Sequence, residues 1–200
     1  MLSEGMIKIG SLAPDISSEA YFPSDDRMGK VGFADSRGKW VILTFYPGDF
    51  TFVCATDIDA FMGKYSDFKK NGAVLYAIST DSIYSHRVWA QTSPRVRKSM
   101  IPMIGDLKGA ITAAYGFLNE STGTAMRGVV IVDPDRIVQY ISVFNDALGK
   151  DAVHIYNAFM GLKYMRDHKA GAGKTYAIPA GWKPGDKPLK YDAVKDIGKL

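Results

Sequence analysis

The 200-residue sequence has one cysteine, three histidines and no long apolar run. The lone Cys54 excludes an internal disulfide framework, and the scattered histidines give no metal-ligand spacing, so we expect neither a metal nor a cofactor. The longest apolar run, Val41–Tyr46, is far shorter than a membrane span, and Met1–Glu4 lacks the basic-then-apolar pattern of a secretory signal. The sequence predicts a cytoplasmic protein with no membrane partner, whose chemistry depends on one sulfur.

An excess of positive charge raises the hypothesis of nucleic-acid binding. The net charge is +4 and the isoelectric point is about 9.0. However, the basic residues are spread along the chain, and their densest group, between His86 and Lys98, is equally typical of a solvated helix end and loop. We prefer the solvated surface and expect no nucleic-acid partner.

Apolar and amphipathic segments alternate along the chain. Alternation of this kind predicts an α/β fold with parallel strands and helices on both faces of the sheet. We expect strands at 40–46, 73–79, 103–104, 128–132 and 137–143, and helices at about 54–70, 83–92, 109–115 and 151–168. This order, which closes with a hairpin and a helix, is typical of a thioredoxin-like fold with a central mixed β-sheet flanked by helices.

The last part of the chain differs in composition from the rest. From Ala170 onward it is rich in glycine, lysine and proline, which favours a tail over a second domain. We therefore expect a thioredoxin-like domain at 1–168 and a C-terminal tail at 169–200 that packs on a partner subunit.

Cys54 has two opposed interpretations. Free cysteine is among the most buried residue types, so an inert core position is the default. Its place in the first turn of a helix favours the thiolate instead, because unpaired backbone N–H groups and the positive end of the helix dipole face it. Thr51 can hydrogen-bond the sulfur or an incoming oxygen, and Pro47 removes an N–H from the turn. Asp57 disfavours a thiolate, so a nearby cation is required.

The segment FYPGDFTFVCATD carries a resemblance that periodicity alone does not supply. Its spacing Pro47-x-x-x-Thr51-x-x-Cys54 resembles the active-site signature of the peroxiredoxins, most closely the alkyl hydroperoxide reductase C-subunit and typical two-cysteine branch. Further similar segments are Ser85-His86-x-x-Trp89, Met103–Asp106, Arg127–Pro134 and Pro179-Ala180-x-Trp182. The resemblance covers nearly the whole chain and implies the thioredoxin-like peroxiredoxin fold.

The resemblance also implies roles for individual residues. Cys54 matches the peroxidatic cysteine, whose thiolate attacks a peroxide and becomes a sulfenic acid. Arg127 matches the arginine that stabilises the thiolate and the leaving oxygen, and would be the required cation. Thr51 would orient the peroxide and Pro47 would shield the sulfur. Asp57 and Trp89 would have supporting roles. For Asp57 the alternative is pairing with the helix dipole, and for Trp89 it is ordinary core packing.

Two positions depart from the family pattern. Ala55 replaces the proline that usually follows the peroxidatic cysteine, which should tune activity without abolishing it. Ile178 occupies the position of the resolving cysteine, so no intersubunit disulfide can form. The chain is therefore expected to work as a one-cysteine enzyme with an external thiol donor, either thioredoxin, glutaredoxin with glutathione, or a dedicated reductase.

The favoured function is a thiol-dependent peroxidase that reduces hydrogen peroxide and organic hydroperoxides. The alternative is a non-catalytic peroxide sensor, a redox relay or a chaperone-like oligomer that has lost turnover, because the resolving cysteine is missing. By resemblance, the expected assembly is a homodimer, with a decamer as a further step.

Overall fold

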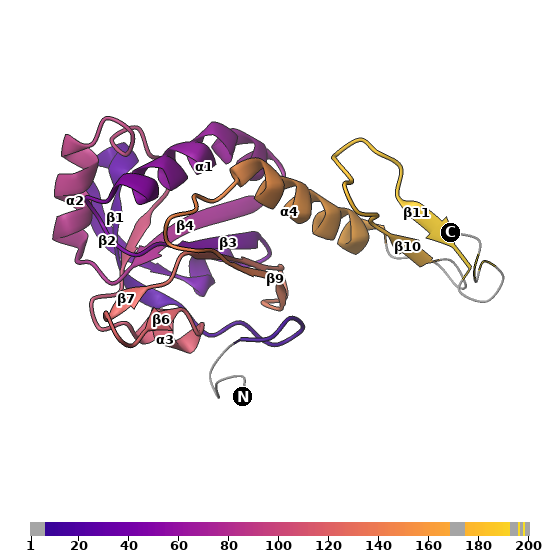
Figure 1. The fold of residues 1–200 in the computed structure, drawn as a ribbon, viewed down its shortest axis with the longest axis horizontal. Helices are drawn as coiled ribbons and strands as arrows, with labels where there is room; N and C mark the ends of the chain where they lie inside the picture. Colours follow the sequence, from indigo (N-terminus) through magenta and orange to yellow (C-terminus); the bar gives the residue numbers. More distant parts are fainter. Residues whose placement is uncertain (1–6, 169–174, 193–195, 197, 199–200) are drawn as a thin grey trace. The chain divides into compact units, whose positions relative to one another are not determined.

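A seven-stranded mixed sheet lies at the centre of the larger part of the chain (Figure 1). Its strands are β1 (Ser17–Phe22), β2 (Arg27–Gly32), β3 (Trp40–Phe45), β4 (Ala73–Ser79), β5 (Met103–Gly105), β8 (Gly128–Val132) and β9 (Val138–Val143). They lie in the order β2-β1-β5-β4-β3-β8-β9. The pairs β3–β4 and β4–β5 are parallel, whereas β1–β2, β1–β5, β3–β8 and β8–β9 are antiparallel.

The structure is a computed structural model that describes residues 7–168, 175–192, 196 and 198. The chain forms two units, Met1–Ala152 and Val153–Leu200. The division into a domain at 1–168 and a tail that packs on a partner subunit stays a prediction.

Among the described residues, four α-helices connect or follow the strands. They are α1 (Phe52–Lys70), α2 (Ile83–Thr92), α3 (Ala110–Ala114) and α4 (Ala152–Asp167). Short elements complete the first unit: the 3-10 helices η1 (Pro23–Asp25) and η2 (Phe33–Ser36), and the two-residue strands β6 (Leu118–Asn119) and β7 (Thr124–Ala125). Helix α1 packs on β4, and α2 packs on β1 and β5. No helix in the described part of the chain is both long and apolar enough to cross a membrane.

The core of the first unit is built around β3. All six of its residues are buried, as expected for a central strand covered on both faces. Phe45 stacks on Phe117 with ring centroids 4.6 Å apart. Gly128 pairs with Phe45 across the sheet, and a Cβ atom at this position would lie 1.9 Å from the Phe117 ring. Glycine is therefore required here to let the aromatic ring approach the strand.

The expected strands and helices are all present, and their ends agree with the prediction to within two residues. The apolar pattern did not predict the hairpin β1–β2 or the short strands that lie outside the central sheet. This edge hairpin has mixed burial along both strands, so its sequence lacks a continuous apolar run.

The second unit contains most of α4 and a small antiparallel ladder. Its strands are β10 (Thr175–Ala177) and β11 (Leu189–Tyr191). The ring of Tyr164 on α4 lies 6.4 Å from that of Tyr176 and 6.3 Å from that of Trp182, measured between centroids. Aromatic packing therefore joins the helix to the segment that follows it within this unit.

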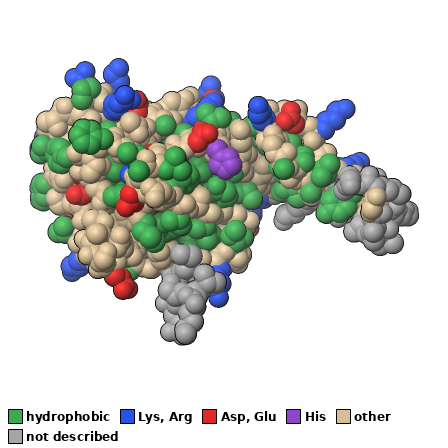
Figure 2. All heavy atoms as spheres, in the orientation of Figure 1, with side chains coloured by type: hydrophobic (Ala, Val, Ile, Leu, Met, Phe, Trp, Pro, Cys, Tyr) green, Lys and Arg blue, Asp and Glu red, His purple; other side chains and the backbone are tan. Residues whose placement is uncertain are grey.

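The densest basic group in the sequence is in part buried or paired with carboxylates. His86 is fully buried, Arg87 pairs with Asp26, and Arg95 pairs with Asp59. On the face drawn in Figure 2, lysine and arginine side chains lie at several separate places. This arrangement favours the solvated surface over a nucleic-acid site.

Candidate active site

The end of β3 and the start of α1 place Cys54 in the interior. The strand ends at Phe45, a loop follows, and Thr51 is the N-cap residue of the helix. Cys54 is thus the third residue of α1, and its side chain is fully buried. Its position in the first helical turn is the predicted one, where backbone N–H groups favour an anion.

Arg127 reaches the sulfur from the strand next to β3. It immediately precedes β8, which pairs with β3, and it is only 2% exposed. Its Nη2 atom lies 3.6 Å from Cys54 Sγ and 3.0 Å from the carbonyl oxygen of Asp146. Its Nη1 atom donates a short hydrogen bond to Asp57 Oδ2. The structure therefore brings together the sulfur, the arginine and the carboxylate that the sequence singled out.

Lys150 is a member of this cluster that the sequence did not predict. Its backbone N–H donates to Asp57 Oδ1 at 2.7 Å, and its Nζ lies 3.2 Å from Asp57 Oδ2. The Nζ atom also donates to the carbonyl oxygen of Phe45 at 2.7 Å, and its side chain is fully buried. A lysine just before a helix is typical of the surface, so no local signal could have found it.

Burial and neighbouring charges act on the two cations in opposite ways. Burial lowers the pKa of Lys150 to about 8, against the opposing attraction of Asp57. Burial also acts to lower the pKa of Arg127, but Cys54 and Asp57 more than offset it, and the net result is a raised pKa. With a thiolate at Cys54, two cations and two anions balance in one buried cluster, as buried charges require.

Thr51 and Pro47 flank the cluster at the loop. The Thr51 hydroxyl donates to the carbonyl oxygen of Gly48 at 2.9 Å, and Thr51 is exposed. A hydroxyl that donates its only hydrogen in this way keeps its lone pairs free to accept. Pro47 is half-buried between the strand and this loop.

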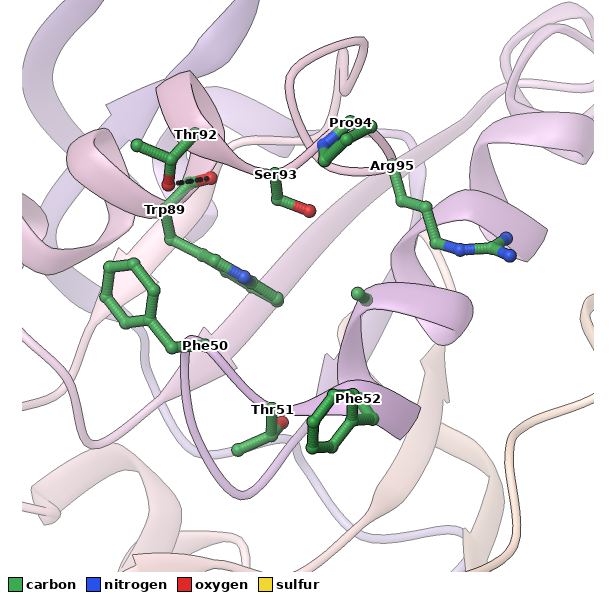
Figure 3. Close-up of a pocket in the computed structure, with 9 residues that line it drawn as sticks. Phe50, Thr51, Phe52, Trp89, Thr92, Ser93, Pro94 and Arg95 are labelled. Carbon is green, nitrogen blue, oxygen red and sulfur yellow. Dashed lines mark hydrogen bonds between the residues drawn. The ribbon is translucent and has the colours of Figure 1, made fainter.

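An apolar pocket opens beside the start of α1. Its volume is about 390 Å³, and it is lined by Phe50, Thr51, Phe52, Ala55, Trp89, Thr92, Ser93, Pro94 and Arg95. Figure 3 shows the indole of Trp89 reaching from α2 into this space, opposite the loop that carries Thr51. Trp89 is 3% exposed and its ring centroid lies 5.8 Å from that of Tyr46, so it serves both the core and the pocket wall.

Metal-ligating groups are not gathered at this site. Across the described residues, no group of three or more His, Cys, Asp and Glu side chains is placed to hold a metal ion. The chemistry that the geometry itself supports is that of a buried sulfur anion beside a guanidinium, namely nucleophilic attack with stabilisation of a negative leaving group.

Comparisons with known proteins show the family of this chain. Residues 9–141 match the AhpC/TSA family. The alkyl hydroperoxide reductase C of Amphibacillus xylanus is 35% identical over 195 residues, which cover 98% of this chain and 100% of that protein. The chloroplastic 2-Cys peroxiredoxin of Arabidopsis thaliana is 37% identical over 191 residues, which cover 92% of this chain and 68% of that protein.

A solved structure shows the same fold. The reduced 2-Cys peroxiredoxin of Plasmodium vivax superposes with a TM-score of 0.83 and 28% identity, covering 91% of this chain and 92% of that one. This similarity confirms the predicted thioredoxin-like peroxiredoxin fold, with its mixed sheet flanked by helices. In sequence and in structure, the chain belongs to the AhpC/TSA family.

Proposed function

We propose that this protein is a thiol-dependent peroxidase that reduces hydrogen peroxide and organic hydroperoxides through Cys54. The observation that carries the proposal is the guanidinium of Arg127, which lies 3.6 Å from the buried sulfur. Family membership supports the reaction class, because the related proteins are named peroxiredoxins and alkyl hydroperoxide reductases. The reaction requires no cofactor, since the sulfur itself is oxidised.

The first half of the reaction uses the buried cluster. The thiolate of Cys54 attacks one peroxide oxygen, a sulfur–oxygen bond forms and the oxygen–oxygen bond breaks. Sulfur is oxidised to a sulfenic acid, and the leaving alkoxide or hydroxide takes a proton to become an alcohol or water. Arg127 stabilises the charge that develops on the leaving oxygen, and Thr51 accepts a hydrogen bond from the peroxide. Asp57 holds the guanidinium, Pro47 shields the sulfur, and Trp89 forms the pocket wall.

The second half requires a thiol from outside the chain. The sequence holds no second cysteine, and by resemblance the resolving position is occupied by Ile178. An external thiol attacks the sulfenic acid to give a mixed disulfide and water, and a second thiol releases Cys54 and a disulfide product. Candidate donors are thioredoxin, glutaredoxin with glutathione, or a dedicated reductase.

The alternative is a peroxide sensor, a redox relay or a chaperone-like oligomer without turnover. Its support is the combination of one cysteine with complete burial of Cys54, because an external thiol must first gain access to the oxidised sulfur. A sensor would pass its oxidation to one specific protein and then stop.

Two measurements test the proposal. Stopped-flow mixing with hydrogen peroxide or cumene hydroperoxide should show a reaction far faster than that of free cysteine, and Cys54→Ser should abolish it. Addition of each candidate donor should then give steady multiple turnover. A sulfur that reacts no faster than free cysteine contradicts the peroxidase, whereas one turnover that ends in a stable mixed disulfide favours the sensor.

Assembly as a homodimer, and further as a decamer, is part of the proposal. Phe50 and Phe52 are 58% and 93% exposed on the loop and first turn beside the sulfur. Two exposed aromatic side chains at one surface support contact with another subunit. Light scattering gives the mass in solution.

We further propose a cytoplasmic location, which cell fractionation tests, although one relative is a chloroplastic protein.

A further inference from the structure

A second buried polar cluster lies behind the loop between β3 and α1. The side chains of His86 and Asp49 are both fully buried, and His86 Nδ1 lies 2.9 Å from Asp49 Oδ2. The hydroxyl of Tyr46 donates to the other carboxylate oxygen, Oδ1, at 2.9 Å. Because a carboxylate only accepts, the imidazole Nδ1 carries the hydrogen of this contact. One carboxylate therefore joins the end of β3, the loop and helix α2.

Tyr46 is a hydrogen-bond donor in this cluster. Burial raises the pKa of Tyr46 well above its usual value, and the charge of Asp49 acts in the same direction. The phenol therefore stays protonated. His86 Nε2 is buried and has no hydrogen-bond partner in the described structure, so the contacts of the ring run through Nδ1. Through Nδ1 the imidazole contacts the Asp49 carboxylate at 2.9 Å and, at a longer distance of 3.4 Å, the Tyr46 hydroxyl.

This cluster fixes the loop that carries Thr51. The backbone N–H of Asp49 donates to Asp81 Oδ2 at 2.9 Å, so the residue is held through its main chain as well. The next residue, Phe50, has a φ of 58°, a left-handed conformation that is strained for a residue with a side chain. Surrounding contacts must maintain it. The Gly48 carbonyl that accepts from Thr51 immediately precedes Asp49.

The free-energy cost of burying these polar groups indicates that the cluster has a role in positioning the loop. Burying a carboxylate with an imidazole is expensive, and apolar residues of similar volume often stabilise a fold as well or better. The contacts of His86 and Asp49 given above are separate from the Arg127 cluster that faces the sulfur. Figure 3 shows Phe50 and Thr51 on the loop, opposite Trp89 of α2, the helix that also carries His86.

We propose that His86 and Asp49 are positioning residues for the peroxide step. Their buried contact fixes the loop so that the Thr51 hydroxyl donates to the Gly48 carbonyl and presents its lone pairs to the peroxide. This inference rests on the proposed peroxidase activity and assigns to α2 a part in orienting the substrate.

The test compares two isosteric variants of His86. His86→Asn places an amide donor near Nδ1 and keeps the bond to Asp49, whereas His86→Gln places its amide near Nε2 and loses that bond. We expect His86→Gln to lower the second-order rate constant with hydrogen peroxide by about tenfold, and His86→Asn to retain most of the rate. The pH titration of the Cys54 thiolate absorbance should be the same in both variants and in the wild type.

A double mutant separates positioning from loss of stability. If His86 acts through Thr51, adding His86→Gln to Thr51→Val should slow the reaction no further than Thr51→Val alone. The control is Ser36→Ala, which removes another buried side-chain bond, of 3.0 Å to Tyr76, and should leave the rate unchanged. If His86→Gln fails to fold, Asp49→Ala removes the same hydrogen bond from its other side and serves in its place.

Each outcome bears on the inference. It is overturned if His86→Gln reacts like the wild type, if its effect multiplies with that of Thr51→Val, or if a shifted thiolate titration accounts for the whole loss. A wild-type protein that reacts no faster than free cysteine contradicts the proposed function itself. A fast wild type with fast His86 variants contradicts the inference alone.

Discussion

Cys54 and Ile178 lie in surroundings of opposite chemistry. Cys54 is enclosed by buried charges, with Arg127 and Asp57 at hydrogen-bond distance of one another. Ile178 instead packs on Gly161 of α4, where an added Cβ would meet the isoleucine side chain at 3.2 Å. The comparison shows that charged groups surround the sulfur, whereas the position matched to a second sulfur carries a half-buried aliphatic side chain. The following predictions sharpen this contrast, from the largest expected effect on the peroxide step to the smallest.

Removal of the guanidinium should have the largest effect. Arg127→Ala should lower the second-order rate constant with hydrogen peroxide by about 10²- to 10³-fold, the usual loss for a donor that stabilises a developing anion. Stopped-flow fluorescence or competition kinetics measures it. Arg27→Ala, which removes a half-exposed arginine, is the matched control and should not change the rate. Equal rates for Arg127→Ala and the wild type would show that the guanidinium does not act on the reaction.

Removal of the buried ammonium should have a smaller effect. Without the Lys150 ammonium, the net positive charge beside the sulfur is smaller, because Asp57 still neutralises part of the charge of Arg127. Lys150→Met should therefore lower the second-order rate constant with hydrogen peroxide at neutral pH by about tenfold. Stopped-flow kinetics measures it. Lys64→Met is the control outside the cluster, and an unchanged rate in Lys150→Met would contradict a role in charge balance.

The pH profile should distinguish lysine from arginine at position 150. Lys150 has a pKa of about 8 in the folded protein against an ordinary 10.5. It therefore loses its charge as pH rises through about 8, and the rate constant per thiolate should fall a few-fold above that pH. Lys150→Arg keeps the charge and should show no fall. A decline of equal size in both proteins would assign it to another group.

The lowered pKa of Lys150 also predicts how the free energy of unfolding depends on pH. Between about pH 8 and 10.5 the unfolded chain binds more protons at Lys150 than the folded protein does. The cost of burying the ammonium is present below pH 8, and it is relieved as pH rises through this window. Denaturant unfolding should show the free energy of unfolding rising with pH for wild type relative to Lys150→Met. A difference independent of pH would contradict the lowered pKa.

Restoring a second sulfur should leave the peroxide step unchanged. If position 178 matches the resolving position, Ile178→Cys should give a disulfide-linked dimer after one equivalent of peroxide, seen on a non-reducing gel. Loss of aliphatic packing against Gly161 should cost about 1 kcal/mol of unfolding free energy, and Ile178→Val controls for it. A variant that forms no linked dimer would show that the match at position 178 is wrong.

Local patterns predicted most of the fold because they record burial. The continuous run of β3 and the helical spacing of α1 show which faces are covered, and the structure places both elements as expected. The hairpin β1–β2 was missed because its burial is mixed and its pairing with β5 brings together residues far apart in the sequence. Edge strands of this kind depend on neighbours that a local pattern does not record.

The candidate site was predictable only in part, for a similar reason. Cys54 and Thr51 stand close in the sequence, so helix position and spacing point to them. Arg127 came from resemblance alone, because 73 residues separate it from the sulfur it contacts. Lys150 lies 93 residues from Asp57, and nothing local distinguishes it from a surface lysine. The bond between Asp49 and His86 is equally non-local.

Because Cys54 is fully buried, its reaction with a labelling reagent reports local opening of the structure. A reagent such as a maleimide can label Cys54 only when the first turn of α1 moves away from the cluster, and no other thiol competes for it. The labelling rate, divided by the rate of the same reagent with an exposed thiol, gives the equilibrium constant of that opening. A donor thiol must reach the same sulfur, so the opening of the reduced protein is the reference against which access to the oxidised sulfur can be compared.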